Sequence, residues 1–200
     1  MPAHEPARLI ARILDVIEGD IVPLTGTGVA RGDKVFGAAI ILKEDLSLIA
    51  AATNNETANP LFHGEIATIN AFHAIPLGER PASRDCYFIS THEPCSLCLS
   101  AITWAGFDNF IYLFGYADTR DVFNIPHDLK ILSEVFGIRD GQYARKNAYW
   151  TSQSLAGMIA DCVETERTDF AARVEAITGI YDDMSGIYQA SKGGDIIPLA

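Results

Sequence analysis

The chain has 200 residues, of which 48% are hydrophobic and 20% charged, a composition typical of a folded globular domain rather than of a disordered chain. No apolar run approaches the ~20 residues that a bilayer-spanning helix needs, and the first residues lack the basic stretch and apolar core of a secretory signal, so we expect a cytoplasmic protein with no membrane partner. The formal net charge of −11 disfavours binding to nucleic acid, which depends on Lys and Arg, and suits a small neutral ligand.

Helices and strands alternate along the first half of the chain. Apolar residues at helical spacing predict a helix over residues 6–18, and the Gly- and Thr-rich residues 20–33 predict a loop. Four apolar segments rich in β-branched residues are predicted to be strands, at residues 35–42, 46–52, 86–91 and 109–114. The first two form a hairpin. Two more helices are predicted, at residues 63–75, which end before Pro76, and at residues 95–105.

The remaining elements have weaker signals. They are a helix at residues 128–136, a fifth strand at 144–150, and helices at 153–164 and 168–189. This order predicts an α/β fold, a three-layer α/β/α sandwich with helices on both faces of a mixed, about five-stranded sheet. We expect residues 1–150 to form the domain that carries the active site, and residues 151–200 to be a helical extension packed on it.

Two short motifs begin the second and third predicted helices. His63-Gly64-Glu65 begins one, and Pro94-Cys95-Ser96-Leu97-Cys98 begins the other. Each helix follows a strand, and a helical crossover links the two strands, so we expect them to run parallel. Both helix starts then meet at one edge of the sheet, where open α/β folds bind their ligands.

The donor atoms in these motifs suit a catalytic zinc ion. Cysteines at i and i+3 of a helix lie on one face, so Cys95 and Cys98 can reach one ion, and His63 completes three protein ligands. Three ligands leave the fourth position for water, whose pKa zinc lowers toward ~7. Glu65 lies two residues from His63, near the metal without being a ligand, and can move protons between that water and a substrate.

The pattern H-x-E with P-C-x-x-C is the signature of zinc deaminases, and the sequence resembles the cytidine-deaminase-like superfamily, most closely its guanine deaminase and tRNA adenosine deaminase branch. The resemblance covers roughly residues 34–118. Four stretches carry it, at residues 36–38 (FGA), 59–65 (NPLFHGE), 93–98 (EPCSLC) and 101–105 (AITWA). Gly64 stands where the family usually has Ala.

The resemblance implies one zinc ion per chain, a five-stranded sheet and an oligomer, which we take to be a homodimer. It also implies that an Asn upstream of His63 contacts the base, for which Asn54 is the best match and Asn55 a competitor. An acidic residue after the fourth strand is expected to reach the pocket. Asp118, our assignment, is one of three candidates, which are Asp118, Asp121 and Asp128.

Two aromatic residues complete the predicted substrate contacts. Phe36 is predicted to be a pocket wall, with a purely structural core role as the alternative. His92 lies beside the metal motif and can line the pocket, or it can be an incidental histidine at the end of a strand.

These residues predict a zinc-dependent hydrolytic deaminase of a free nucleobase, nucleoside or related amino-heterocycle, with a guanine-like substrate as the first choice. A tRNA adenosine deaminase is one alternative, but the acidic chain does not favour binding to RNA. A non-catalytic zinc-binding member of the fold is another, but Glu65 argues against it. A redox C-x-x-C pair or half of a structural zinc site would not need the His-x-Glu motif.

Overall fold

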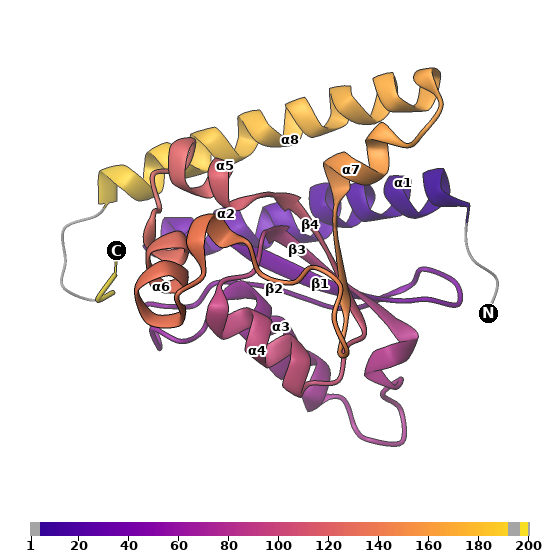
Figure 1. Ribbon diagram of the computed structural model, residues 1–200, viewed down its shortest axis with the longest axis horizontal. Coiled ribbons are helices and arrows are strands. Elements are labelled where there is room, and N and C mark those ends of the chain that lie inside the picture. The colour runs from indigo at the N-terminus through magenta and orange to yellow at the C-terminus, as the bar shows by residue number, and fades with distance from the viewer. Residues whose placement is uncertain (1–4, 192–196, 200) are drawn as a thin grey trace.

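The computed structural model describes residues 5–191 and 197–199 and contains one five-stranded sheet between two layers of helices (Figure 1). Its strand order is β2-β1-β3-β4-β5. The strands are β1 (Gly37–Leu42), β2 (Leu48–Thr53), β3 (Cys86–His92), β4 (Asn109–Phe114) and β5 (Thr151–Ser154). β1 is antiparallel to β2 and β3, and β3, β4 and β5 are parallel. The predicted mixed α/β sandwich is confirmed.

Two helical layers cover the sheet. On one face lie α3 (Gly64–Ala74) and α4 (Ser96–Trp104), with a core that includes Phe72, Phe88 and Phe110. The opposite face carries the larger apolar core, to which helices near both ends of the chain contribute. Those helices are α1 (Pro6–Val16), α2 (Val22–Ala30), α7 (Leu155–Ala160) and α8 (Glu164–Ser191).

The prediction of a loop over residues 20–33 is wrong. Residues Ile17–Ile21 form a wider π-helical turn, η1, that joins α1 to α2. Pro23 is tolerated because it lies in the first turn of α2. Gly28 brings α2 close to β2, since a Cβ there would lie 3.2 Å from Cγ2 of Thr53. The Gly-rich composition therefore reflects close packing rather than a loop.

The predicted strand over residues 144–150 is also wrong, because this segment turns before the fifth strand. The side chain of Asn147 accepts hydrogen bonds from the backbone N–H groups of Tyr149 and Trp150, at 2.9 and 3.1 Å. These bonds close a local turn. β5 begins only at Thr151 and pairs with β4.

Short helices complete the chain after β4. The sequence did not predict α5 (Tyr116–Asp121), whereas α6 (His127–Phe136) agrees with the predicted helix. Two short 3-10 helices are η2 (Ser83–Asp85) and η3 (Arg139–Gly141). Buried side chains of α8 face the large core, and they are Phe170, Ile177, Tyr181, Met184 and Tyr188. Within residues 5–191 and 197–199, no helix has the length and apolar character needed to cross a membrane.

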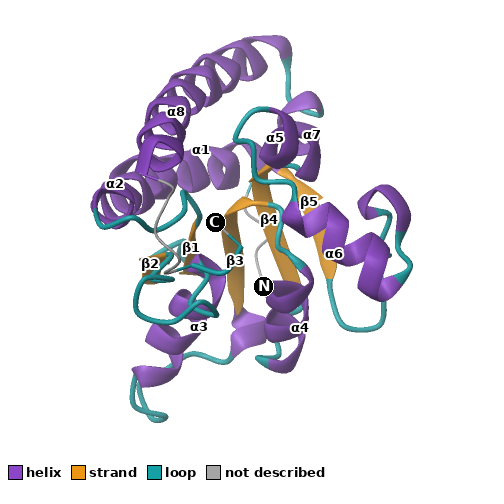
Figure 2. Ribbon diagram, turned by 90° about the vertical axis from the view of Figure 1, so that its left-hand side faces the viewer, coloured by secondary structure: helices purple, strands orange, loops and turns teal. Residues whose placement is uncertain are grey.

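The topology brings the starts of α3 and α4 together. β2 and β3 both run antiparallel to β1, which lies between them, so they are parallel to each other as the sequence predicted. The helix that follows each strand therefore begins at the same edge of the sheet (Figure 2).

Candidate metal centre

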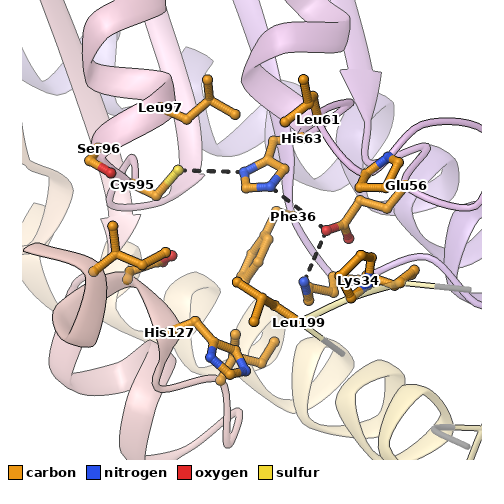
Figure 3. Close-up of a pocket in the computed structure, with 16 residues that line it drawn as sticks. Lys34, Phe36, Glu56, Leu61, His63, Cys95, Ser96, Leu97, His127 and Leu199 are labelled. Carbon is orange, nitrogen blue, oxygen red and sulfur yellow. Dashed lines mark hydrogen bonds and ion pairs between the residues drawn. The ribbon is translucent and has the colours of Figure 1, made fainter. Parts of the chain in front are cut away.

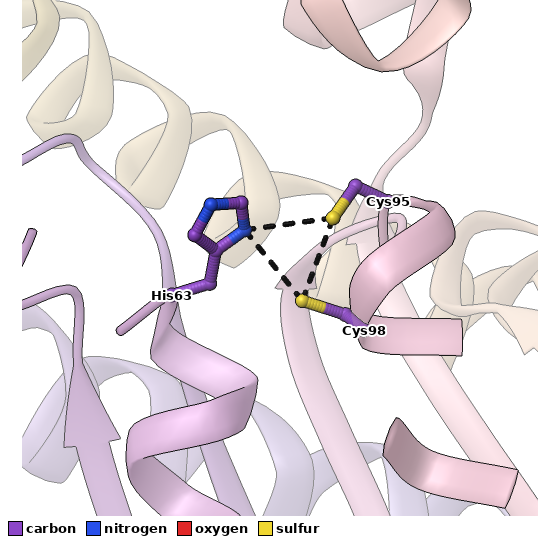
Figure 4. Close-up of side chains that lie close together, drawn as sticks. All are labelled: His63, Cys95 and Cys98. Atoms are coloured by element: carbon purple, nitrogen blue, oxygen red, sulfur yellow. Dashed lines mark hydrogen bonds between the residues drawn. The ribbon is translucent and has the colours of Figure 1, made fainter. Parts of the chain in front are cut away.

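His63, Cys95 and Cys98 converge at this edge of the sheet (Figure 4). His63 immediately precedes α3, Cys95 immediately precedes α4, and Cys98 lies in the first turn of α4. Nδ1 of His63 is 3.5 Å from Sγ of Cys95 and 3.7 Å from Sγ of Cys98, and the two sulfur atoms are 3.6 Å apart. The three donors form a nearly equilateral triangle.

This triangle fits a tetrahedral zinc ion. With Zn–S near 2.3 Å and Zn–N near 2.0 Å, tetrahedral angles place two sulfur ligands about 3.8 Å apart and a nitrogen and a sulfur ligand about 3.5 Å apart. The observed separations of 3.5, 3.7 and 3.6 Å are close to both values. The soft thiolates and the imidazole are ligands that zinc prefers, and the fourth position is left for a non-protein ligand.

The electrostatics of the metal-free site keep a proton on His63. Burial alone would lower the pKa of His63. The hydrogen bond and the charge attraction from Cys95 outweigh burial, and the charges of Glu65 and Glu56 add smaller increases, so the pKa of His63 rises to about 9. Contact with Cys98 and His63 lowers the pKa of Cys95, whereas burial raises the pKa of Cys98. Zinc must therefore displace protons from the site.

We expect the affinity for zinc to rise by at least about tenfold per pH unit between pH 6.5 and 8.5, because His63 and the thiols must lose protons to bind the metal. Protons compete most strongly below the His63 pKa of about 9, so the affinity is lowest at the acid end of this range. Competition with a chromophoric chelator at pH 6.5, 7.5 and 8.5 measures it. A dissociation constant that does not change with pH would contradict the protonated imidazole.

Glu65 lies beside the metal donors and inside the protein. Its side chain is 4% exposed, Oε1 accepts a hydrogen bond from Oγ of Ser90 at 3.0 Å, and Oε2 accepts one from Sγ of Cys98 at 3.2 Å. Burial, and next the charge of Cys95, raise the pKa of Glu65. A carboxyl group with a raised pKa takes up a proton more readily than a free carboxyl group, as a proton-transfer residue must.

A cavity of about 310 Å³ opens beside the metal donors (Figure 3). Apolar side chains line much of it, including Phe36, Leu61, Leu97, Ile131 and Leu199, and Glu56 and Lys34 lie on the side of His63. A second, much smaller cavity borders His63, Glu65, Cys95 and Asp128 and also touches Phe36. An apolar pocket with a few convergent polar groups is the usual form of a small-molecule site.

Phe36 and His92 both lie at this small cavity. Their ring centroids are 4.6 Å apart, and Nδ1 of His92 is 3.0 Å from Oγ1 of Thr91. Burial lowers the pKa of His92 to about 3, so its ring is neutral. Nε2 of His92 is buried and has no hydrogen-bond partner within the described residues. The structure thus brings both predicted residues to the metal centre.

Asn54 and Asp118 are placed differently from their predicted roles. Asn54 is fully buried, and its side chain accepts a hydrogen bond from the backbone N–H of Gly64 and donates one to Glu56 at 2.8 Å. Asp118 is exposed and accepts a hydrogen bond from the N–H of Gly115 at 2.8 Å, at the start of α5. Neither Asn54 nor its competitor Asn55 is part of the described cavity walls, and Asp118 lines a third cavity beside Glu93.

The acidic candidate that reaches the metal centre is Asp128, on the first turn of α6. Burial and then the charge of Cys95 raise its pKa to about 8. Asp128 is one of the three acidic candidates from the sequence, but no motif distinguishes it from the other two. Glu56 and Lys34, which line the cavity of about 310 Å³, were not among the predicted site residues. No pattern in the sequence points to either of these two residues.

Comparison with known proteins agrees with this geometry. Residues 27–114 match the family model of the cytidine and deoxycytidylate deaminase zinc-binding region, and this segment includes all three metal donors. This part of the chain is therefore similar to the zinc-binding region of these deaminases. The chain is 33% identical over 88 residues to the guanine deaminase of Bacillus subtilis (strain 168), a match that covers 43% of this chain. The match covers only 54% of the Bacillus protein, so this deaminase region spans about half the length of that curated relative.

Solved structures confirm the deaminase fold over most of the chain. A variant of the protein NE0047, solved in complex with 8-azaguanine, superposes with a TM-score of 0.54 at 18% identity and covers 90% of this chain and 86% of its own. The guanine deaminase of Nitrosomonas europaea superposes with a TM-score of 0.50 at 20% identity, covering 85% and 84% respectively. The region that carries the deaminase donors therefore sits in a deaminase-like fold.

Proposed function

We propose that the protein is a zinc-dependent hydrolase that removes an amino group from a small amino-heterocycle. The observation that carries the proposal is the buried carboxyl group of Glu65 beside the triangle of His63, Cys95 and Cys98, at the wall of a mostly apolar cavity. The match to the Bacillus subtilis guanine deaminase supports a guanine-like ring as the first substrate to test.

The proposed chemistry divides the work between the metal and the side chains. Zinc held by His63, Cys95 and Cys98 supplies a water molecule that ionises near neutral pH. Glu65 would take one proton from the attacking water and deliver it to a ring nitrogen. It would then take the second proton, from the hydroxyl group added to the ring carbon, and pass it to the amine, which leaves as ammonia while the carbonyl group forms. Oγ of Ser90 lies 3.0 Å from one carboxylate oxygen of Glu65, and the other oxygen lies 3.2 Å from Sγ of Cys98, beside the metal donors.

Three side chains are proposed to contact the substrate. Phe36 packs against the ring, and the neutral His92 offers Nε2, a buried atom without a hydrogen-bond partner among the described residues. Asp128 takes the acidic position that sequence reasoning gave to Asp118, because it lines both cavities at the metal centre. Asn54 is proposed to act on the site through the start of α3, to which its side chain is bonded.

The C-terminal helices and the oligomer are further parts of the proposal. α8 contacts α1 and α2, which supports residues 151–200 as an extension of the same domain.

Leu97 and Trp104 lie seven residues apart on α4, hence on one helical face, and are 37% and 90% exposed. An exposed apolar stripe of this kind supports a homodimer, which the molar mass in solution tests.

Release of ammonia by the zinc-loaded protein tests the activity. The panel contains guanine, adenine, cytosine, their nucleosides, pterins and triazines. We expect release from one small substrate at one zinc per chain. Release from tRNA alone would favour the tRNA adenosine deaminase alternative. If no substrate releases ammonia although one zinc ion is bound per chain, the proposed activity is contradicted and a non-catalytic zinc protein is favoured.

A further inference from the structure

Glu56 lies on the opposite side of the His63 ring from the sulfur atom of Cys95 (Figure 3). Nδ1 of His63 faces Cys95 and Cys98, whereas Nε2 lies 3.7 Å from Oε1 of Glu56. The side chain of Glu56 is 1% exposed, so little water competes for this contact. The two nitrogens of the imidazole thus face a metal donor set on one side and a carboxylate on the other.

Two other side chains fix the position of the Glu56 carboxylate. Nζ of Lys34 lies 2.9 Å from Oε1, and Nδ2 of Asn54 donates a hydrogen bond of 2.8 Å to Oε2. Asn54 also accepts the hydrogen bond from the N–H of Gly64, the residue after His63. The carboxylate is therefore tied to the same helix start that carries the imidazole, and ring and carboxylate are held as one unit.

We propose that Glu56 is a positioning residue for the metal centre, which accepts the Nε2–H of His63 and thereby orients the ring with Nδ1 aimed at the zinc position. A metal-binding imidazole almost always donates its other N–H to a carboxylate, carbonyl or water, and this bond sets the tautomer and raises the basicity of the ligand. A small movement of either side chain shortens 3.7 Å to a hydrogen bond. The inference rests on zinc occupying the three donors of the proposed function.

Lys34 has the complementary role in this arrangement. A buried carboxylate without a counter-charge is costly, and the ammonium group of Lys34, itself 7% exposed, supplies that charge. The two residues have opposite effects on a bound cation. Removing Glu56 leaves a positive charge near the metal, whereas removing Lys34 leaves a negative one. A purely structural ion pair would not show this asymmetry, since loss of either partner breaks the same contact.

Zinc affinity, measured by competition with a chromophoric chelator, tests the proposal without any substrate. Glu56→Gln is expected to weaken zinc binding by about 10- to 100-fold, the usual range for loss of such a partner. Lys34→Met is expected to bind zinc as tightly as the unmodified chain or more tightly, although it unfolds at a lower temperature. The double variant Lys34→Met/Glu56→Leu removes both charges of the pair, so no unpaired charge stays buried and the variant is expected to fold. It is expected to show the same weakened binding as Glu56→Gln.

Asp33→Asn is the matched control. Asp33 is also a buried carboxylate. It accepts hydrogen bonds from Arg31 and from the backbone N–H of Thr57, the residue after Glu56, at 3.1 and 2.9 Å, and does not contact His63 in the way that Glu56 does. Its zinc affinity should stay within about twofold of the unmodified chain. Equal weakening by Lys34→Met and Glu56→Gln, or unchanged affinity in Glu56→Gln, would overturn the positioning role. Failure of the unmodified chain to bind one zinc would instead refute the proposed metal centre.

Discussion

Replacing Glu65 by Gln is expected to lower turnover by at least about 10²- to 10⁴-fold while one zinc ion stays bound per chain. The amide keeps the shape of the side chain and can still accept the hydrogen bond from Ser90, but it cannot take up and release a proton. The three metal donors are untouched. Initial rates of ammonia release, measured beside zinc content, test the substitution.

The stability of the same variant separates a catalytic role from a structural one. Burial raises the pKa of Glu65, so this group lowers the stability of the folded protein as the pH rises from the unfolded pKa to the higher folded pKa. A neutral amide avoids this penalty. We therefore expect Glu65→Gln to unfold in the metal-free state at the same temperature as the unmodified chain, or a higher one. Near-full turnover would refute the proton transfer, and a collapse of stability would indicate a structural role.

The metal centre could be predicted because its geometry is local. Each motif occupies one helix start, and the spacing of Cys95 and Cys98 alone places both sulfurs on one face of α4. Only the relation between the two helices is non-local, and the crossover between β2 and β3 determines it. Residues that no local pattern ties to the metal, such as Glu56 and Lys34, become visible only when the chain is folded.

The differences between the sequence-based expectations and the structure have the same physical origin. The Gly- and Thr-rich segment before β1 looks like a loop by composition, but tertiary packing against β2 makes it the helix α2. Asn54 looks like a substrate ligand by resemblance, yet its amide is used by Gly64 and Glu56. The sequence offers both Asp118 and Asp128 for the acidic residue expected in the pocket. Which of them lies near the metal donors depends on how α5 and α6 pack after β4.

Replacing Gly64 by Ala, the residue that usually stands here in the resembling family, is expected to destabilise this protein by about 1–3 kcal/mol. A Cβ at Gly64 would lie 2.8 Å from the carbonyl oxygen of Phe36, 2.8 Å from Cα of Gly37 and 3.0 Å from its backbone nitrogen. These are backbone atoms at the start of β1, so no side chain can turn aside to relieve the contact. α3 must shift, and His63 and Glu65 shift with it.

The sign of this effect makes the test decisive. Where a helix has free space, Gly→Ala stabilises by up to about 1 kcal/mol, because Ala loses less conformational entropy on folding. Gly179 on α8 is such a position, since a Cβ there meets no atom within 4 Å. Chemical denaturation should therefore show Gly179→Ala more stable and Gly64→Ala less stable than the unmodified chain, with weaker zinc binding only in Gly64→Ala. A stabilised Gly64→Ala would mean that α3 and β1 are not in backbone contact, and that the close approach does not explain the glycine.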